Sequence, residues 1–189
     1  AILLDVSGSM NEEQLTTAEL AINHFIYDLL DKDDELVLMT FAGRSRILQQ
    51  WARDREKLSQ ALARAKDGPR EPTAGAPSVP PPNYGTAVYD AVHTSLGFAA
   101  KGTNRKKAVL VITDGIDTAS RRTIKQVQEA IRASEVLVYA LGVDPGASGF
   151  FGHDSGVNTD ALRKLTDDTG GRTPVVEGLK DLVKGTARL

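Results

Sequence analysis

The chain of 189 residues contains no cysteine, three histidines and a single tryptophan. The absence of cysteine excludes disulfides, thiol catalysis and cysteine-based zinc sites. No apolar run approaches the length of a membrane-spanning helix, so we expect no direct membrane insertion by this segment. The net charge of −2 gives no reason to expect nucleic acid or an anionic membrane as a partner.

The composition that remains is ordinary for a globular protein, with 41% hydrophobic and 25% charged residues. Residues 1–189 are most simply one domain, which is long enough to bury a full hydrophobic core. The chain begins with Ala1 inside an apolar run of strand character and lacks an initiator methionine. We therefore interpret it as a segment cut from a longer protein.

Apolar runs of strand length alternate with helical patterns, which is typical of βαβ units and a mainly parallel sheet. We expect strands at 2–5, 36–41, 46–51, 108–113, 136–143 and 172–176, and helices at about 12–29, 54–65, 86–100, 121–133 and 159–169, with a closing helix after them. The turn at Gly43 is too short for a parallel crossover, so the second and third strands should form an antiparallel hairpin. We predict a Rossmann-like, doubly wound α/β fold with a mainly parallel six-stranded sheet, one antiparallel edge strand and helices on both faces.

The first helix has a clear beginning. Asn11 is the expected N-cap, and Gln14 three residues later completes a capping box. Six apolar residues then recur with helical spacing and should form one buried face: Leu15, Ala18, Ile22, Phe25, Ile26 and Leu29.

Two stretches interrupt the alternation. Residues 67–84 hold six of the eight prolines, which excludes regular helix or central strand. We interpret them as a proline-rich surface insertion, and the alternative is a rim of the binding face. Residues 144–158 are glycine-rich and contain Phe150 and Phe151, which either pack onto the domain or form an exposed apolar contact.

The most informative segment is the loop after the first strand, where Asp5, Ser7 and Ser9 alternate. A carboxylate and two hydroxyls on a tight loop can direct three oxygens toward one point. Oxygen ligands suit a hard divalent cation such as Mg²⁺, Ca²⁺ or Mn²⁺. A loop at the carboxyl end of a strand is also where open α/β sheets bind their ligands.

Two further segments should end at the same edge of the sheet. Thr86 opens the expected third helix, and Asp114 ends the most apolar strand. In a doubly wound sheet this strand neighbours the first one, so Asp5 and Asp114 should face each other across the crevice. Two such carboxylates repel unless a cation or a proton lies between them. Each segment alone is explained as well by a cap or a turn, and it is their combination that favours a metal site.

These motifs closely resemble the von Willebrand factor type A domain. The resemblance rests on Asp5-x-Ser7-x-Ser9, Gly85-Thr86 with residues 87–91, and Ile112-Thr113-Asp114-Gly115, and it extends over essentially the whole chain. It implies a metal-ion-dependent adhesion site with the metal ligands Asp5, Ser7, Ser9, Thr86 and Asp114. It also implies a bound Mg²⁺, with Mn²⁺ or Ca²⁺ as alternatives, and a partner protein that offers an Asp or Glu side chain to the ion.

The surrounding loops should then decide which partner binds. We expect them to be residues 43–46, 67–84, 115–120 and 144–158, with these partner-binding rim residues: Tyr84, Gly115, Phe150 and Phe151. Because many animal extracellular members contain cysteine, its absence suggests a bacterial origin, and we interpret the location as extracytoplasmic: secreted, periplasmic or surface-anchored.

Two other functions compete with a non-enzymatic adhesion-type module. One is Mg²⁺-dependent phosphoryl transfer with Asp5 as the nucleophile. Against it, the chain has Ser7 where phosphatases of the haloacid dehalogenase type have a second acid, and no nucleotide-binding glycine loop is present. The histidines His24, His93 and His153 are expected to be structural or solvated. The other alternative is a scaffold domain of a larger assembly.

Overall fold

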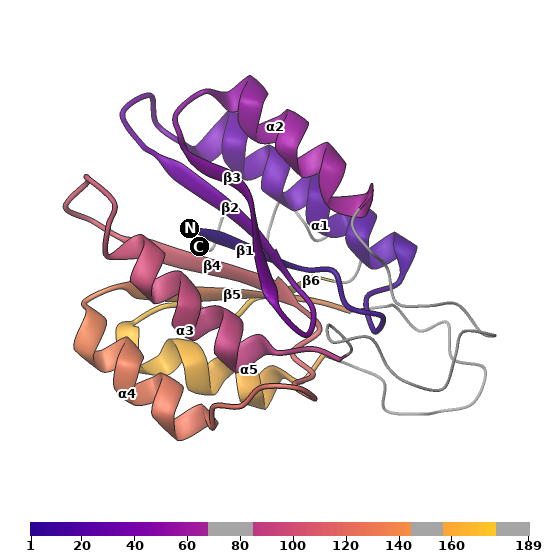
Figure 1. Ribbon diagram of the computed structural model, residues 1–189, viewed down its shortest axis with the longest axis vertical. Coiled ribbons are helices and arrows are strands. Elements are labelled where there is room, and N and C mark those ends of the chain that lie inside the picture. Colours follow the sequence, from indigo (N-terminus) through magenta and orange to yellow (C-terminus); the bar gives the residue numbers. More distant parts are fainter. Residues whose placement is uncertain (68–84, 145–156, 177–189) are drawn as a thin grey trace.

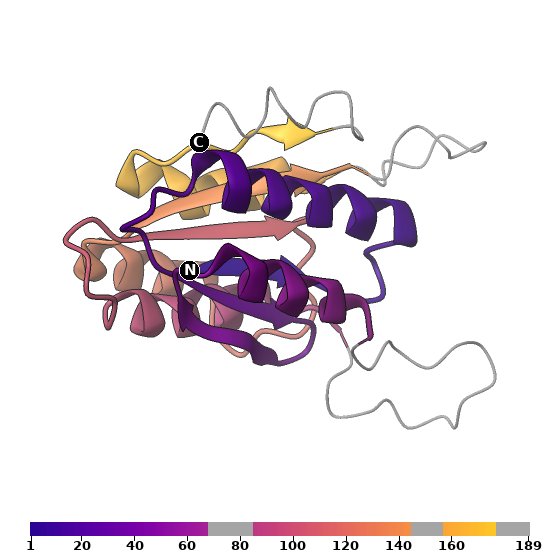
Figure 2. The same ribbon diagram turned by 90° about the horizontal axis from the view of Figure 1, so that it is seen from above.

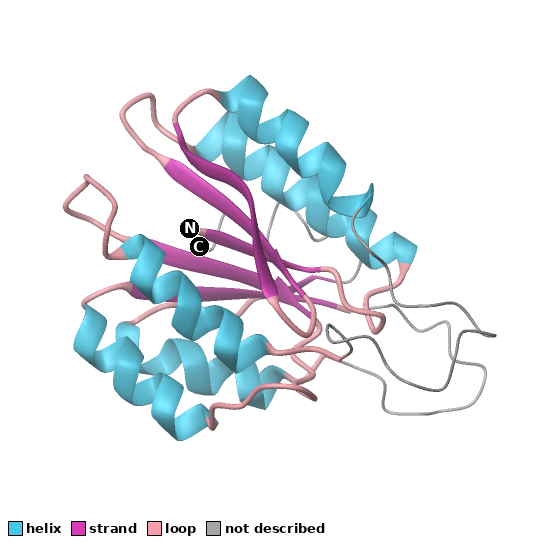
Figure 3. Ribbon diagram, in the orientation of Figure 1, coloured by secondary structure: helices cyan, strands magenta, loops and turns pink. Residues whose placement is uncertain are grey.

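A computed structural model describes residues 1–67, 85–144 and 157–176. Its centre is a six-stranded sheet with the strand order β3-β2-β1-β4-β5-β6 (Figures 1 and 3). The strands are β1 (Ile2–Asp5), β2 (Leu36–Phe41), β3 (Ser45–Ala52), β4 (Ala108–Thr113), β5 (Leu137–Val143) and β6 (Val175–Val176). All neighbouring pairs are parallel except β2 and β3, which form the antiparallel hairpin at one edge. The predicted fold class and the position of the hairpin are confirmed.

Helices cover both faces of the sheet, because the central strands β1 and β4 are buried on both sides. The helices are α1 (Glu12–His24), α2 (Arg55–Ala63), α3 (Val88–Ala99), α4 (Ile124–Ser134) and α5 (Thr159–Thr166). One hydrophobic cluster joins α1 and α2 to one face, and a second joins α3, α4 and α5 to the other. Figure 1 shows the same division, with α1 and α2 on one side of the strands. No helix in the described part of the chain is long and apolar enough to cross a membrane.

Helix α1 begins as expected and ends differently. Asn11 and Gln14 form the capping box, each accepting a 2.8 Å hydrogen bond from the backbone of the other. At its other end the chain widens into a π-helical turn, Phe25–Leu29, in which the Leu30 N–H donates to the Phe25 carbonyl at 2.9 Å. This wider turn moves the apolar register by one position. Leu30 is therefore buried and Leu29 is 43% exposed, so the prediction that Leu29 belongs to the buried face was wrong.

Two other helices begin later than expected. Helix α4 starts at Ile124 instead of near 121, because Thr123 is its N-cap and forms a capping box with Gln126. Helix α3 starts at Val88, so Thr86 lies before the helix and Ala87 is the N-cap. Helix α5 continues into a short 3-10 turn, Asp167–Thr169, which matches the predicted extent.

Several predictions fall outside the described residues. They concern the closing helix, the proline-rich insertion after residue 67, and most of the glycine-rich segment 144–158.

Candidate metal centre

The carboxyl ends of β1 and β4 lie side by side, which brings the predicted site together. These two strands pair in parallel, with Leu4 opposite Ile112, so the segments that follow them leave the sheet at one edge. Figure 2 shows the arrowheads of β4 and β6 pointing to this same side of the molecule. Three predicted parts of the site follow or adjoin this edge: the loop of residues 5–9 (the hydroxyl loop), Thr86 and Asp114.

Asp5 is the innermost polar residue of the site, with no exposed surface. Its Oδ1 accepts a 2.9 Å hydrogen bond from the Ser7 N–H, and its Oδ2 accepts one of 2.6 Å from the Thr113 hydroxyl. The pKa of Asp5 is raised to about 7, mainly by burial and to a smaller extent by the nearby Asp114 carboxylate. Both hydrogen bonds act in the opposite direction. Within the described residues, no positive charge compensates this buried carboxylate.

Thr113 connects the two acidic segments. The sequence placed it in the motif of residues 112–115, but it was not predicted to be a residue of the site. While its hydroxyl donates to Asp5, the same oxygen accepts the Gly115 N–H at 3.0 Å. A threonine at the end of the otherwise apolar strand β4 was the signal that could have found it. Its side chain is fully buried, so the hydroxyl cannot be explained by contact with water.

The loop after β1 holds its two serines close to each other. The Oγ atoms of Ser7 and Ser9 are 3.0 Å apart, and a turn is closed by the Met10 N–H, which donates to the Ser7 carbonyl. Ser7 is buried, whereas Ser9 is exposed. The two hydroxyls thus lead from the buried carboxylate toward the surface.

Thr86 is buried and held by its backbone. Its N–H donates to the Thr118 hydroxyl at 2.9 Å, and its carbonyl accepts the N–H groups of Thr118 and Ala119. Within the described residues its own hydroxyl makes no hydrogen bond, and it does not cap α3. The alternative that this threonine serves only as an N-cap therefore does not apply.

Asp114 is 4% exposed and is fixed on both sides. Its Oδ1 accepts the Ile116 N–H at 3.0 Å, and its carbonyl accepts the Asn158 N–H at 2.8 Å. Gly115 follows it with a φ of +80°, where a side chain would come within 2.9 Å of the Asn158 carbonyl oxygen. The tight turn therefore requires glycine.

The rim residues are only partly described. Tyr84, Phe150 and Phe151 lie outside the described residues. Gly115 is buried and shapes the turn, and the exposed apolar residue beside it is Ile116, at 38%.

The donor set consists of two carboxylates and three hydroxyls, all from oxygen. Such ligands fit a hard cation that prefers six oxygens and leave room for water or an external carboxylate. No group of three or more His, Cys, Asp and Glu side chains in the described part of the chain is placed to hold a metal. The present set falls outside that pattern because three of its five residues are hydroxyl residues and only two are acidic.

The two histidines that the structure describes lie on or near helices. His24 is near the end of α1, where its Nδ1 is 2.6 Å from Asp28, and His93 lies within α3. His153 lies outside the described residues.

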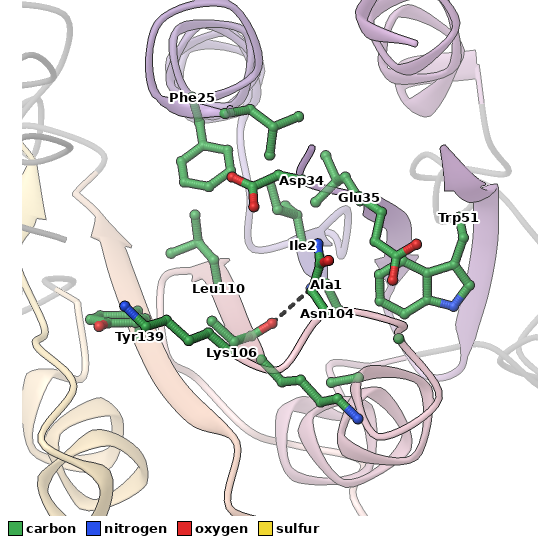
Figure 4. Close-up of a pocket in the computed structure, with 16 residues that line it drawn as sticks. Ala1, Ile2, Phe25, Asp34, Glu35, Trp51, Asn104, Lys106, Leu110 and Tyr139 are labelled. Carbon is green, nitrogen blue, oxygen red and sulfur yellow. Dashed lines mark hydrogen bonds between the residues drawn. The ribbon is translucent and has the colours of Figure 1, made fainter. Parts of the chain in front are cut away.

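A separate pocket of about 290 Å³ lies at the opposite, amino-terminal edge of the sheet (Figure 4). Its walls include Phe25, Trp51, Leu110 and Tyr139. The Ala1 backbone nitrogen also lines it and donates a 2.7 Å hydrogen bond to the Ala108 carbonyl. This pocket shares no residue with the candidate metal centre.

Comparison with known proteins identifies the family of this chain. Residues 1–116 match the model of the von Willebrand factor type A domain, so the chain belongs to this family. No curated protein matches it closely enough to report.

Solved structures agree with the fold. BatB from Bacteroides thetaiotaomicron, a conserved hypothetical protein, superposes with a TM-score of 0.67 at 20% identity, covering 100% of this chain and 98% of that one. A von Willebrand factor type A protein from Catenulispora acidiphila gives a TM-score of 0.72 at 19% identity, over 98% of this chain and 40% of that one. Proximal thread matrix protein 1 from the mussel byssus, in a structure with a zinc-occupied MIDAS motif, gives 0.66 at 16% identity, over 98% and 43%.

Proposed function

We propose that this domain is a protein-binding module that acts through a divalent cation. The ion would be held by the residues Asp5, Ser7, Ser9, Thr86 and Asp114. The acidic side chain of a partner protein would complete its coordination, so that binding depends on the metal. Membership of a family whose domains generally mediate protein interactions supports this proposal.

One observation carries the proposal: two carboxylates lie at one edge of the sheet, and the described part of the chain offers Asp5 no cationic partner. The hydroxyl of Thr113 joins Asp5 to the turn that follows Asp114. A divalent ion beside both carboxylates would offset their repulsion and the cost of burying Asp5. The bound ion would supply a strongly polarising, nearly neutral centre that attracts an external carboxylate.

Mg²⁺ is the ion that this donor set favours, since two carboxylates with hydroxyls and water suit its small octahedral shell. Mn²⁺ and Ca²⁺ accept the same ligands, and the mussel protein was found with zinc in its MIDAS motif.

The first test is calorimetric titration of Mg²⁺ into chelator-stripped protein. We expect saturable binding at one site in the wild type and none in Asp114→Ala. A matched control is Asp160→Ala, which removes an exposed carboxylate from the first turn of α5 at the same edge of the sheet and should bind Mg²⁺ as the wild type does. Equal binding by the wild type and Asp114→Ala would contradict the assignment of the site.

The second test concerns partner binding. Once an acidic partner is in hand, Thr86→Ala should weaken the complex while thermal unfolding of the metal-free domain stays nearly unchanged. Partner binding that persists in excess EDTA would overturn the adhesion-type mechanism.

Phosphoryl transfer is disfavoured by the geometry of Asp5. A nucleophilic carboxylate must reach the phosphorus atom of a bulky ester, yet Asp5 has no exposed surface. We therefore expect no turnover of a generic phosphate ester with Mg²⁺. A bacterial origin and an extracytoplasmic location stay predictions from the sequence.

A further inference from the structure

The described rim of the candidate metal centre carries an uneven charge pattern. On the β2–β3 hairpin, Arg44 and Arg46 are exposed. Glu12 and Glu13 follow the loop of residues 5–9 and are exposed in the first turn of α1. The glutamates are explained by the helix, whose N-terminus favours negative charge. The arginines have no such structural explanation.

Neither arginine is committed to a partner within the described residues. The ion pairs in this part of the chain involve other side chains: His24 with Asp28, Lys57 with Asp54, Arg122 with Asp90, and Arg132 with Asp168. The hairpin thus carries two exposed arginines for which the described residues provide no ion-pair partner.

Backbone hydrogen bonds tie the tip of this hairpin to the metal-binding segments. The Val6 N–H donates to the Phe41 carbonyl at 2.9 Å, and the Ala87 N–H donates to the Ala42 carbonyl at 2.8 Å. Arg44 is two residues beyond Ala42, and two residues span at most about 7 Å. Its backbone therefore lies on the order of 10 Å from that of Thr86, close to the distance over which salt screens charges at about 0.1 M.

We propose that the partner segment carries a second carboxylate beside the one that coordinates the metal, and that Arg44 recognises it, with Arg46 adding to the attraction. This inference rests on the proposed function, because it places the partner at the metal centre. The net charge of −2 for the whole chain argues against an extended polyanion and in favour of a short acidic segment. Glu12 and Glu13 would repel a second acid on the α1 side, so the segment should bind in one direction.

The test uses capped tetrapeptides as probes and nuclear magnetic resonance titration of the labelled domain with Mg²⁺. One probe contains a single aspartate, and the others carry a second aspartate at increasing distance from the first. For the best spacing we expect a gain in affinity of roughly two- to five-fold over the single-aspartate probe, as for an exposed ion pair. The gain should decrease as salt is added.

The variant Arg44→Gln should lose this gain and still bind the single-aspartate probe as the wild type does. Arg105→Gln is the matched control, because it removes an exposed arginine from the loop at the opposite edge of the sheet and should keep the gain. An unchanged gain in Arg44→Gln, or no gain in a wild type that binds the single aspartate, would overturn the inference alone. Failure of every probe to bind the Mg²⁺-loaded wild type would overturn the proposed function with it.

Discussion

Replacing Thr113 by valine tests whether its hydroxyl positions the metal ligands. Valine has nearly the same shape, so the change opens no cavity and removes only the hydroxyl. Two buried hydrogen bonds disappear: the 2.6 Å bond to Asp5 and the 3.0 Å bond from the Gly115 N–H. Each of the two buried groups left without a partner costs about 1–3 kcal/mol, so we expect the free energy of unfolding of the metal-free domain to fall by about 2–6 kcal/mol.

The effect on the metal separates positioning from stability. Asp5 would lose one of the two bonds that orient its carboxylate, and loss of a group that orients a metal ligand typically weakens metal binding about 10- to 100-fold. Urea unfolding measures the first effect, and calorimetric Mg²⁺ titration measures the second. Thr113→Ser keeps the hydroxyl and should recover most of the affinity.

A core variant provides the control. Val111 is fully buried in the same strand, and Val111→Ala should cost about 2 kcal/mol of stability through lost burial and a small cavity. Its Mg²⁺ affinity should stay at the wild-type level. If Thr113→Val binds Mg²⁺ as tightly as Val111→Ala does, the hydroxyl is only a structural element and the positioning argument is refuted.

Three further predictions concern the same edge of the sheet. Gly115→Ala should destabilise the domain by at least about 1 kcal/mol, because φ is +80° and the new methyl group meets a carbonyl oxygen at 2.9 Å. The control Gly97→Ala, in open space on α3, should instead stabilise the domain by about 0.5–1 kcal/mol. Urea unfolding measures both changes. Burial by itself would raise the pKa of Asp90, but hydrogen bonds from the Arg121 and Arg122 N–H groups and the Arg122 guanidinium lower it. The stability that Asp90→Asn removes should therefore be present at neutral pH and should vanish as the pH falls below the ordinary aspartate pKa of about 3.9. Urea unfolding of the wild type and the variant across this pH range measures the effect. Excess EDTA should lower the melting temperature of the Mg²⁺-loaded wild type and leave that of Asp114→Ala unchanged; equal shifts would contradict a single site at Asp114.

The strands were predictable because their apolar runs are short, bounded and rich in β-branched residues. The run 108–113 coincides with β4, and the brief turn at Gly43 correctly placed the antiparallel edge. Helix boundaries depended on local chemistry in the same way where a capping box was present, as at Asn11.

Predictions failed where contacts between distant segments decide the outcome. Residues 121 and 122 were predicted to be helical, but their backbone N–H groups donate to Asp90 on α3. The helix begins only after the N-cap Thr123. The π-helical turn that exposes Leu29 cannot be predicted from apolar residues that repeat every 3.6 positions. Thr113 was missed for a related reason: its importance comes from Asp5, a residue 108 positions away in the sequence.

The candidate site separates binding strength from partner choice. The hydrogen bonds to the two carboxylates come from the Ser7 N–H, the Thr113 hydroxyl and the Ile116 N–H, and of these residues Ser7 and Thr113 are buried next to the sheet. The charges that would discriminate between partners lie on the hairpin tip, which backbone hydrogen bonds from Val6 and Ala87 join to this frame. Since the backbone links do not depend on the side chain at 44, the tip can change its charge without disturbing the ligands. Charge reversal in Arg44→Glu should therefore leave Mg²⁺ affinity unchanged in calorimetry and shift probe preference from a second acidic residue to a basic one; a parallel loss of Mg²⁺ binding would show that frame and rim are coupled after all.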